Sequence, residues 1–161
     1  MRHAQASPDA THFYMNKEST VLNNLIKTLK DGQEGFKQAA ESVGNTKLKS
    51  LFRDYSEQRS RFASALQGEA RRHGETEPET SSSATGALHR GWINLTSAIT
   101  GGDEHAILAE CERGEDSAVE EYKKALADGL SPSAQEVVSR QFAEIKAAHD
   151  RIKSLRDAAK S

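Results

Sequence analysis

The sequence contains a single cysteine, no long apolar run and no large excess of charge of one sign. Cys111 has no second cysteine with which to form an internal disulfide, and its place in a helical apolar pattern predicts a buried, reduced thiol. No apolar run approaches the roughly 18 residues that a membrane-spanning helix needs. The formal net charge of -2 provides no basic field that could hold nucleic acid or an anionic membrane. We therefore expect no nucleic-acid or membrane partner.

The first residues, MRHAQASPDATHFYM, lack the apolar core of a signal peptide, so we expect a cytoplasmic protein. Residues 1–18 show no sustained periodicity and include a Ser-Pro pair, which predicts a flexible N-terminal tail. Residues 19–161 are numerous enough to form one domain around one core.

From Thr20 onward, apolar residues recur at steps of three and four, the spacing of one buried helix face. Glycine-containing breaks divide this pattern into segments. The segments predict four long helices near 20–43, 46–73, 103–128 and 132–158, with a shorter helix near 84–100. The long connection between the second and third long helices fits an all-α, ferritin-like four-helix bundle with one crossover that contains the extra helix.

Five segments along the chain resemble an uncharacterised family of bacterial ferritin-like four-helix-bundle proteins. In order, these segments are LNNLIKTLKDGQEGFKQAAE, LFRDYSEQRSRFASALQ, GALHRGW, LAECERGEDSAVEEYKKAL and AAHDRIKSLRD. The resemblance covers about residues 20–157 and leaves the tail outside. It implies the bundle fold and a distant relation to bundle proteins associated with stress responses, but no defined activity.

A ferritin-like di-iron site takes one Glu from each of two helices and a Glu-x-x-His pair from each of the other two. The sequence contains no Glu-x-x-His, and its only Asp-x-x-His, Asp9 to His12, lies in the predicted tail. We therefore expect the standard di-iron site to be absent.

A rotation of about 100° per residue indicates which polar side chains face the centre of the predicted bundle. On the first long helix Gln33 faces inward, whereas Glu34 points away, so the carboxylate that a di-iron site needs is missing there. Because antiparallel helices of similar length align their midpoints, polar residues at mid-helix are predicted to meet in one buried layer. The layer consists of Gln33, Gln58, Arg59, Glu115 and His149.

This polar layer has two interpretations. In the structural one, Glu115 pairs with Arg59, His149 or both, and the pair fixes the helix register without leaving a buried charge unpaired. In the other, Glu112, Glu115 and His149 form a variant site for iron or another divalent metal. The cation in the layer disfavours a dication, so the structural interpretation is favoured and no catalytic residue is predicted.

Three further features are interpreted as structural. Glu69 and His73 have the spacing of a shared metal site, but His73 ends its helix and is expected to interact with the last carbonyls. Trp92 is in phase with apolar neighbours and is expected to pack the crossover helix. Gly32 and Gly35 lower helix propensity, which predicts close approach by a neighbouring element.

The favoured function is therefore a non-catalytic helical module with a stress-related or protein-interaction role, acting on an unknown protein partner or on a second copy of itself. The alternative is a metal-binding or redox protein that uses a variant site in the bundle centre. A nucleophilic enzyme is disfavoured, because no Ser, Cys or Lys is placed beside a plausible base at mid-bundle.

Overall fold

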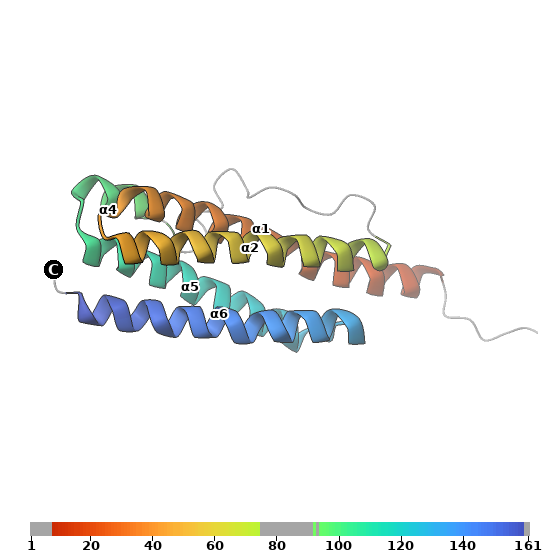
Figure 1. The fold of residues 1–161 in the computed structure, drawn as a ribbon. Coiled ribbons are helices and arrows are strands. Elements are labelled where there is room, and N and C mark those ends of the chain that lie inside the picture. The colour runs from red at the N-terminus through yellow and green to blue at the C-terminus, as the bar shows by residue number, and fades with distance from the viewer. Residues whose placement is uncertain (1–7, 75–91, 93, 160–161) are drawn as a thin grey trace, which may run out of the picture.

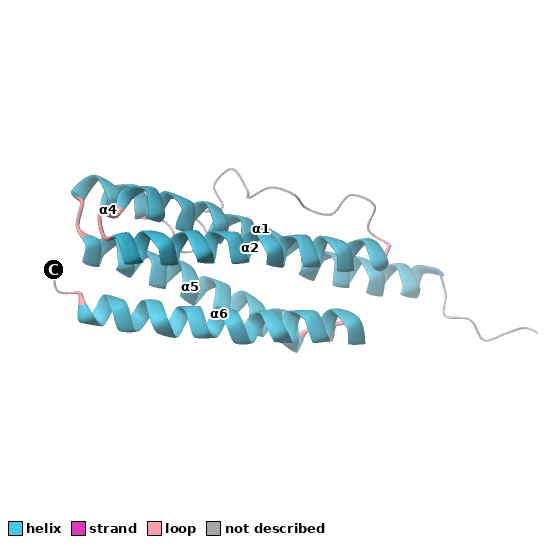
Figure 2. Cartoon of the chain, viewed as in Figure 1, coloured by secondary structure: helices cyan, strands magenta, loops and turns pink. Residues whose placement is uncertain are grey.

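The computed structural model describes residues 8–74, 92 and 94–159, and within these ranges the chain forms five helices and no strand. The helices are α1 (Pro8–Ser42), α2 (Thr46–Arg72), α4 (Leu95–Gly101), α5 (Glu104–Ala127) and α6 (Pro132–Ala158), as Figure 2 shows. The predicted all-α class is confirmed. None of these helices has a stretch that is both long and apolar enough to cross a bilayer.

The predicted bounds of α2, α5 and α6 are confirmed to within one residue. The first helix was predicted from about residue 20, whereas α1 begins at Pro8 and so includes residues that we assigned to the tail. A formed helix extends at little cost into a segment without an apolar face, and proline is well suited to a first helical turn. The crossover helix, predicted over 84–100, is confirmed only over Leu95–Gly101: Trp92 and Asn94 precede the helix, and residues 84–91 and 93 lie outside the described residues.

Side chains at the helix ends explain why these boundaries were readable from sequence. The carboxamide of Asn45 accepts hydrogen bonds from the N–H groups of Lys47 and Leu48, at 2.9 and 3.1 Å, at the start of α2. Asp103 caps α5 in the same way by accepting from the N–H of His105 at 3.0 Å. Gly102 ends α4 with a φ of 66°, a left-handed conformation that glycine adopts without steric cost.

The four long helices pack side by side, each beside two neighbours that run in the opposite direction (Figure 1). Helices α1 and α2 form one antiparallel pair, and α5 and α6 form the other. The pairs join through α1 with α5 and through α2 with α6, so α2 and α5 lie diagonally across the centre. Helix α4 lies at one end of the molecule, against α1 and α5.

The apolar core falls into two halves along the helix axes. One half includes Leu25, Leu66 and Tyr122, and the other includes Phe36, Phe52 and Trp92. Polar side chains from α2 and α5 lie at the level between these halves. The two apolar halves of the core are thus separated by buried polar groups at the middle of the bundle.

Trp92, which precedes α4, is inserted between α1 and α5. Its indole is 3% exposed and meets the Phe36 ring edge-on, with 5.1 Å between the centroids. A Cβ atom built on Gly35 would stand 2.5 Å from the indole, and one built on Gly114 would stand 2.2 Å from it. Both helices therefore need glycine where the indole touches them. The predictions of a packing role for Trp92 and of a close approach at Gly35 are confirmed.

Candidate functional site

An ion pair between Arg59 of α2 and Glu115 of α5 occupies the centre of the four helices. Nη1 and Nη2 of Arg59 donate to Oε1 and Oε2 of Glu115, at 2.5 and 2.7 Å. Both side chains are 1% exposed, and the pair spans the diagonal of the bundle. Burial alone would lower the pKa of Arg59, but the charge and the hydrogen bonds of Glu115 raise it overall. Arg59 therefore keeps its proton, and the bidentate geometry satisfies both carboxylate oxygens.

The other contacts of Arg59 come from α1 and from its own helix. Its Cζ lies 5.4 Å from the centroid of the Phe36 ring, in cation–π geometry. Its Nε donates to Oε1 of Gln58 at 3.1 Å. A Cβ atom on Gly32 would lie 3.6 Å from Nη1, an ordinary van der Waals distance, so the guanidinium packs against α1 here without requiring the close approach that we predicted for this glycine. These contacts fix the guanidinium in one position.

Two members of the predicted polar layer lie apart from this pair. Gln33 is half-buried; its main-chain carbonyl accepts from Ser56 Oγ at 2.8 Å, and its Oε1 has no hydrogen-bond partner among the described residues. His149 contacts Asp116 and Asp150 at the surface instead of Glu115. The prediction that His149 completes the buried layer, or joins Glu115 in a metal site, is therefore wrong.

The buried stripe of α6 explains the error at His149. Ala148 is buried as well as Ile145 and Ile152, which shifts the middle of the stripe away from His149. At about 100° per residue, His149 lies roughly 60° from that middle, at the edge of the buried face. Its side chain keeps 16% of its surface exposed. We placed the histidine from Ile145 and Ile152 alone, and this was too coarse to separate centre from edge.

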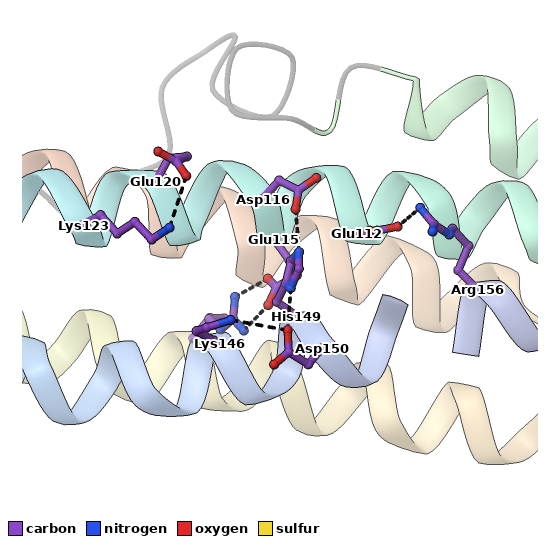
Figure 3. Close-up of polar contacts among 10 residues, drawn as sticks. Glu112, Glu115, Asp116, Glu120, Lys123, Lys146, His149, Asp150 and Arg156 are labelled. Atoms are coloured by element: carbon purple, nitrogen blue, oxygen red, sulfur yellow. Dashed lines mark hydrogen bonds and ion pairs between the residues drawn. The ribbon is translucent and has the colours of Figure 1, made fainter. Parts of the chain in front are cut away.

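His149 instead takes part in a polar cluster on the surface between α5 and α6, shown in Figure 3. Its Nε2 lies 2.5 Å from Oδ1 of Asp116, and its Nδ1 lies 3.0 Å from Oδ1 of Asp150. Partial burial lowers the pKa of His149, but hydrogen bonds to Asp150 and Asp116 together raise it overall. Glu112, one turn before Asp116, is buried and forms an ion pair with Arg156 of α6.

Glu112, Asp116 and His149 could hold a metal, because each offers a ligand atom and these atoms all lie within 4.8 Å of one another. The variant metal site predicted from the sequence consisted of Glu112, Glu115 and His149. The structure turns Glu115 inward to Arg59 and places Asp116 beside His149. Consecutive residues on a helix point about 100° apart, so Glu115 and Asp116 serve different groups.

Several buried polar residues were not predicted from the sequence, among them Glu110, Gln141 and Asp31. Glu110 is 4% exposed and accepts from the main-chain N–H of Asn94 at 3.0 Å, which fixes the chain at the start of α4. Gln141 accepts from the Tyr122 hydroxyl at 2.7 Å. Asp31 is fully buried and lies one turn before Gly35, on the face of α1 that meets Trp92. Glu110 could not be predicted from the rotation of the four long helices, because its partner Asn94 belongs to the segment that starts α4.

At the end of the molecule where α2 ends and α6 begins, polar contacts link α1, α2 and α6. The Nε2 of His73 lies 3.0 Å from Ser131 Oγ, and its Nδ1 lies 3.3 Å from Glu18. Glu69 accepts from Ser133 Oγ at 3.0 Å. The expectation that His73 ends its helix and interacts with the last carbonyls is confirmed for its main-chain N–H, which donates to the carbonyls of Glu69 and Ala70 at 3.2 Å, while its ring reaches neighbouring helices.

The groups nearest the central pair are poorly suited to chemistry. Burial raises the pKa of the Cys111 thiol well above its usual value, and this disfavours the reactive thiolate. Burial also raises the pKa of Tyr122, whose hydroxyl is engaged with Gln141. The centre can therefore fix helix register, while the residues that could hold a metal ion, within the described part of the chain, lie in the surface cluster.

Comparison with known protein families matches residues 17–128 to the family described as Domain of unknown function (DUF2383), and the chain belongs to this family. The match includes α2, α4, α5 and most of α1, with both residues of the central ion pair, while α6 lies outside it. The comparison with curated proteins found no match.

Proposed function

For this member of the DUF2383 family, we propose a ferritin-like four-helix-bundle protein in which a structural ion pair takes the place of a di-iron centre. The order of the long helices and the long connection between α2 and α5 support the ferritin-like plan. The proposed role is that of a non-catalytic cytoplasmic module in protein interaction, of the stress-related kind that the sequence resemblance implies.

The observation that carries this proposal is the bidentate contact between Arg59 and Glu115. A di-iron centre needs several carboxylates that converge on two cations. Here the central carboxylate already gives both oxygens to a guanidinium, which would repel a dication placed beside it. This arrangement opposes the alternative of a redox protein with its metal in the bundle centre.

The experiment compares air oxidation of Fe²⁺ by the tag-free wild-type chain and by Glu115→Gln. We expect the two proteins to oxidise Fe²⁺ at the same rate, and no faster than a Glu34→Gln control, because Glu34 is exposed on α1. Faster oxidation by the wild-type chain that Glu115→Gln abolishes would place the metal chemistry in the centre and overturn the proposal.

We further propose that the chain associates with a second copy of itself through the groove between α2 and α6. This groove has a volume of about 550 Å³. Its lining is largely apolar, with one positive and one negative side chain, and consists of Phe62, Ala65, Val137, Arg140, Gln141, Ala143 and Glu144. In a two-fold dimer the same surface faces itself, so Arg140 of one copy can approach Glu144 of the other.

The solution mass of the chain and of two lysine variants tests this interaction. Ala65→Lys places a charge in the groove, and Ala147→Lys places one on the exposed surface of α6 outside it. We expect a dimer for the wild type and for Ala147→Lys, and a monomer for Ala65→Lys. A wild-type monomer at high concentration would contradict self-association.

A further inference from the structure

The surface cluster between α5 and α6 combines ligand types and geometry that the central ion pair lacks. Glu112 and Asp116 are one turn apart on α5 and share a face, and His149 approaches them from α6 (Figure 3). One ligand atom from each residue lies within 4.8 Å of the other two. We propose that Glu112, Asp116 and His149 bind one first-row divalent transition-metal ion at this surface.

The position of Asp150 supports the role of His149 as a ligand. Histidines that bind metals commonly donate their second ring N–H to a carboxylate, which fixes the tautomer and the ring orientation. The Nδ1 of His149 lies 3.0 Å from Asp150, and Nε2 points toward Asp116. With a proton held on Nδ1, the lone pair of Nε2 is directed at the place where the two α5 carboxylates converge. Asp150 is thus a positioning residue.

The charges around the cluster allow a cation to enter. Arg156 is the counter-ion of Glu112, but its Nη2 and Nε also donate to Oδ1 of Asp157, at 2.7 and 3.1 Å. Arg156 can therefore release Glu112 and keep an anionic partner. On the other side, Lys146 Nζ lies 3.7 Å from Asp150 and is directed to that residue, not to the ligands. A metal ion would take the place of the proton that joins His149 to Asp116.

The donor set indicates the class of metal. Two carboxylates and one imidazole suit Zn²⁺, Mn²⁺ or Fe²⁺, whereas Ca²⁺ takes six to eight oxygen ligands. The Asp116 side chain is 60% exposed, so water can fill the remaining coordination positions. Three protein ligands with an open position are typical of sites where the metal exchanges or meets a small ligand.

Calorimetric titration of the tag-free, chelator-treated chain with Zn²⁺ at neutral pH tests the site. We expect one Zn²⁺ per chain, loss of this binding in Asp116→Asn and in His149→Gln, and roughly 10- to 100-fold weaker binding in Asp150→Asn. Matched controls are Glu120→Gln, an exposed carboxylate further along α5, and His105→Gln, a histidine near the start of the same helix. Both controls should bind Zn²⁺ like the wild type.

Arg156→Gln tests whether the counter-ion of Glu112 competes with the metal ion. Removing this cation frees Glu112, so Zn²⁺ binding should be at least as tight as in the wild type. The substituted ligands lie at the surface, and a thermal melt of each variant checks that it folds. Absence of one-to-one binding, or binding that Asp116→Asn and His149→Gln leave unchanged, overturns the proposal. Either result leaves the Fe²⁺ comparison at Glu115 unaffected, so the two proposals fail separately.

Discussion

The indole of Trp92 lies directly on the backbone of Gly114, so close that a Cβ atom at this position would stand 2.2 Å from the ring. We expect Gly114→Ala to cost about 1–3 kcal/mol of unfolding free energy, the usual range for overpacking a core. The matched control is Gly68→Ala in α2, where a Cβ atom meets nothing within 4 Å. Gly68→Ala should stabilise the protein by about 0.5–1 kcal/mol, because alanine loses less backbone conformational entropy than glycine when a helix forms. Urea denaturation of both variants measures the difference, and equal effects would contradict the insertion of Trp92.

The hydrogen bond between Tyr122 and Gln141 provides a second prediction. Tyr122 is fully buried, and its hydroxyl donates to Oε1 of Gln141 at 2.7 Å. Tyr122→Phe leaves that oxygen buried without its donor, which should cost about 1–3 kcal/mol. The half-buried Tyr55 is the control, and Tyr55→Phe should cost less than about 0.5 kcal/mol. Chemical denaturation measures the unfolding free energy of both variants. Similar losses of unfolding free energy would mean that the hydrogen bond from Tyr122 to Gln141 does not stabilise the fold.

The stability contributed by His149 should depend on pH. Hydrogen bonds to Asp150 and Asp116 outweigh partial burial and raise the folded-state pKa of His149 above the unfolded value of 6.5. A raised pKa means that protonation favours the folded state. The contribution is therefore fully present below pH 6.5 and is lost as the pH rises through the folded-state pKa.

Denaturation of the wild type and of His149→Gln in metal-free buffer tests this sign. The stability difference between the two proteins should be largest in mild acid and should shrink toward alkaline pH. His105→Gln serves as a control for the loss of a histidine on the neighbouring helix. A difference that grows with pH would show that the histidine binds its neighbours in the neutral form.

Local and periodic features of the fold were predictable from the sequence, whereas contacts that depend on the crossover were not. Asn45 and Asp103 cap their helices by contacts a few residues away, so the starts of α2 and α5 could be read directly. Pairing of Arg59 with Glu115 was also anticipated, because a charge on a buried face requires a partner. Glu110 was missed, because it accepts from the main-chain N–H of Asn94 at the start of α4, a contact that four long helices alone would lack.

The candidate metal ligands show where rotational reasoning reaches its limit. Glu112 and His149 belong to the described group that could hold a metal ion, but their predicted partner was Glu115, and His149 was predicted on the buried face. Glu115 points inward as predicted, and Asp116 points about 100° away from it, so the two were not confused. The direction of His149 was misjudged by roughly 60°, and the packing of α5 against α6 places this histidine beside Asp116.

Arg59 and Glu115 form a structural ion pair at the centre of the bundle. The most direct measurement compares the unfolding free energy of Glu115→Ala with that of Glu34→Ala. Glu34 is the control because its side chain is exposed on α1 and accepts a hydrogen bond from Gln38 one turn away. Glu115→Ala leaves a buried guanidinium unpaired and should cost about 3–5 kcal/mol, whereas Glu34→Ala should cost less than about 0.5 kcal/mol. The double variant Arg59→Met with Glu115→Leu removes both charges together, so it should be more stable than Glu115→Ala alone. Small and equal losses in Glu115→Ala and Glu34→Ala would contradict the structural role of this ion pair.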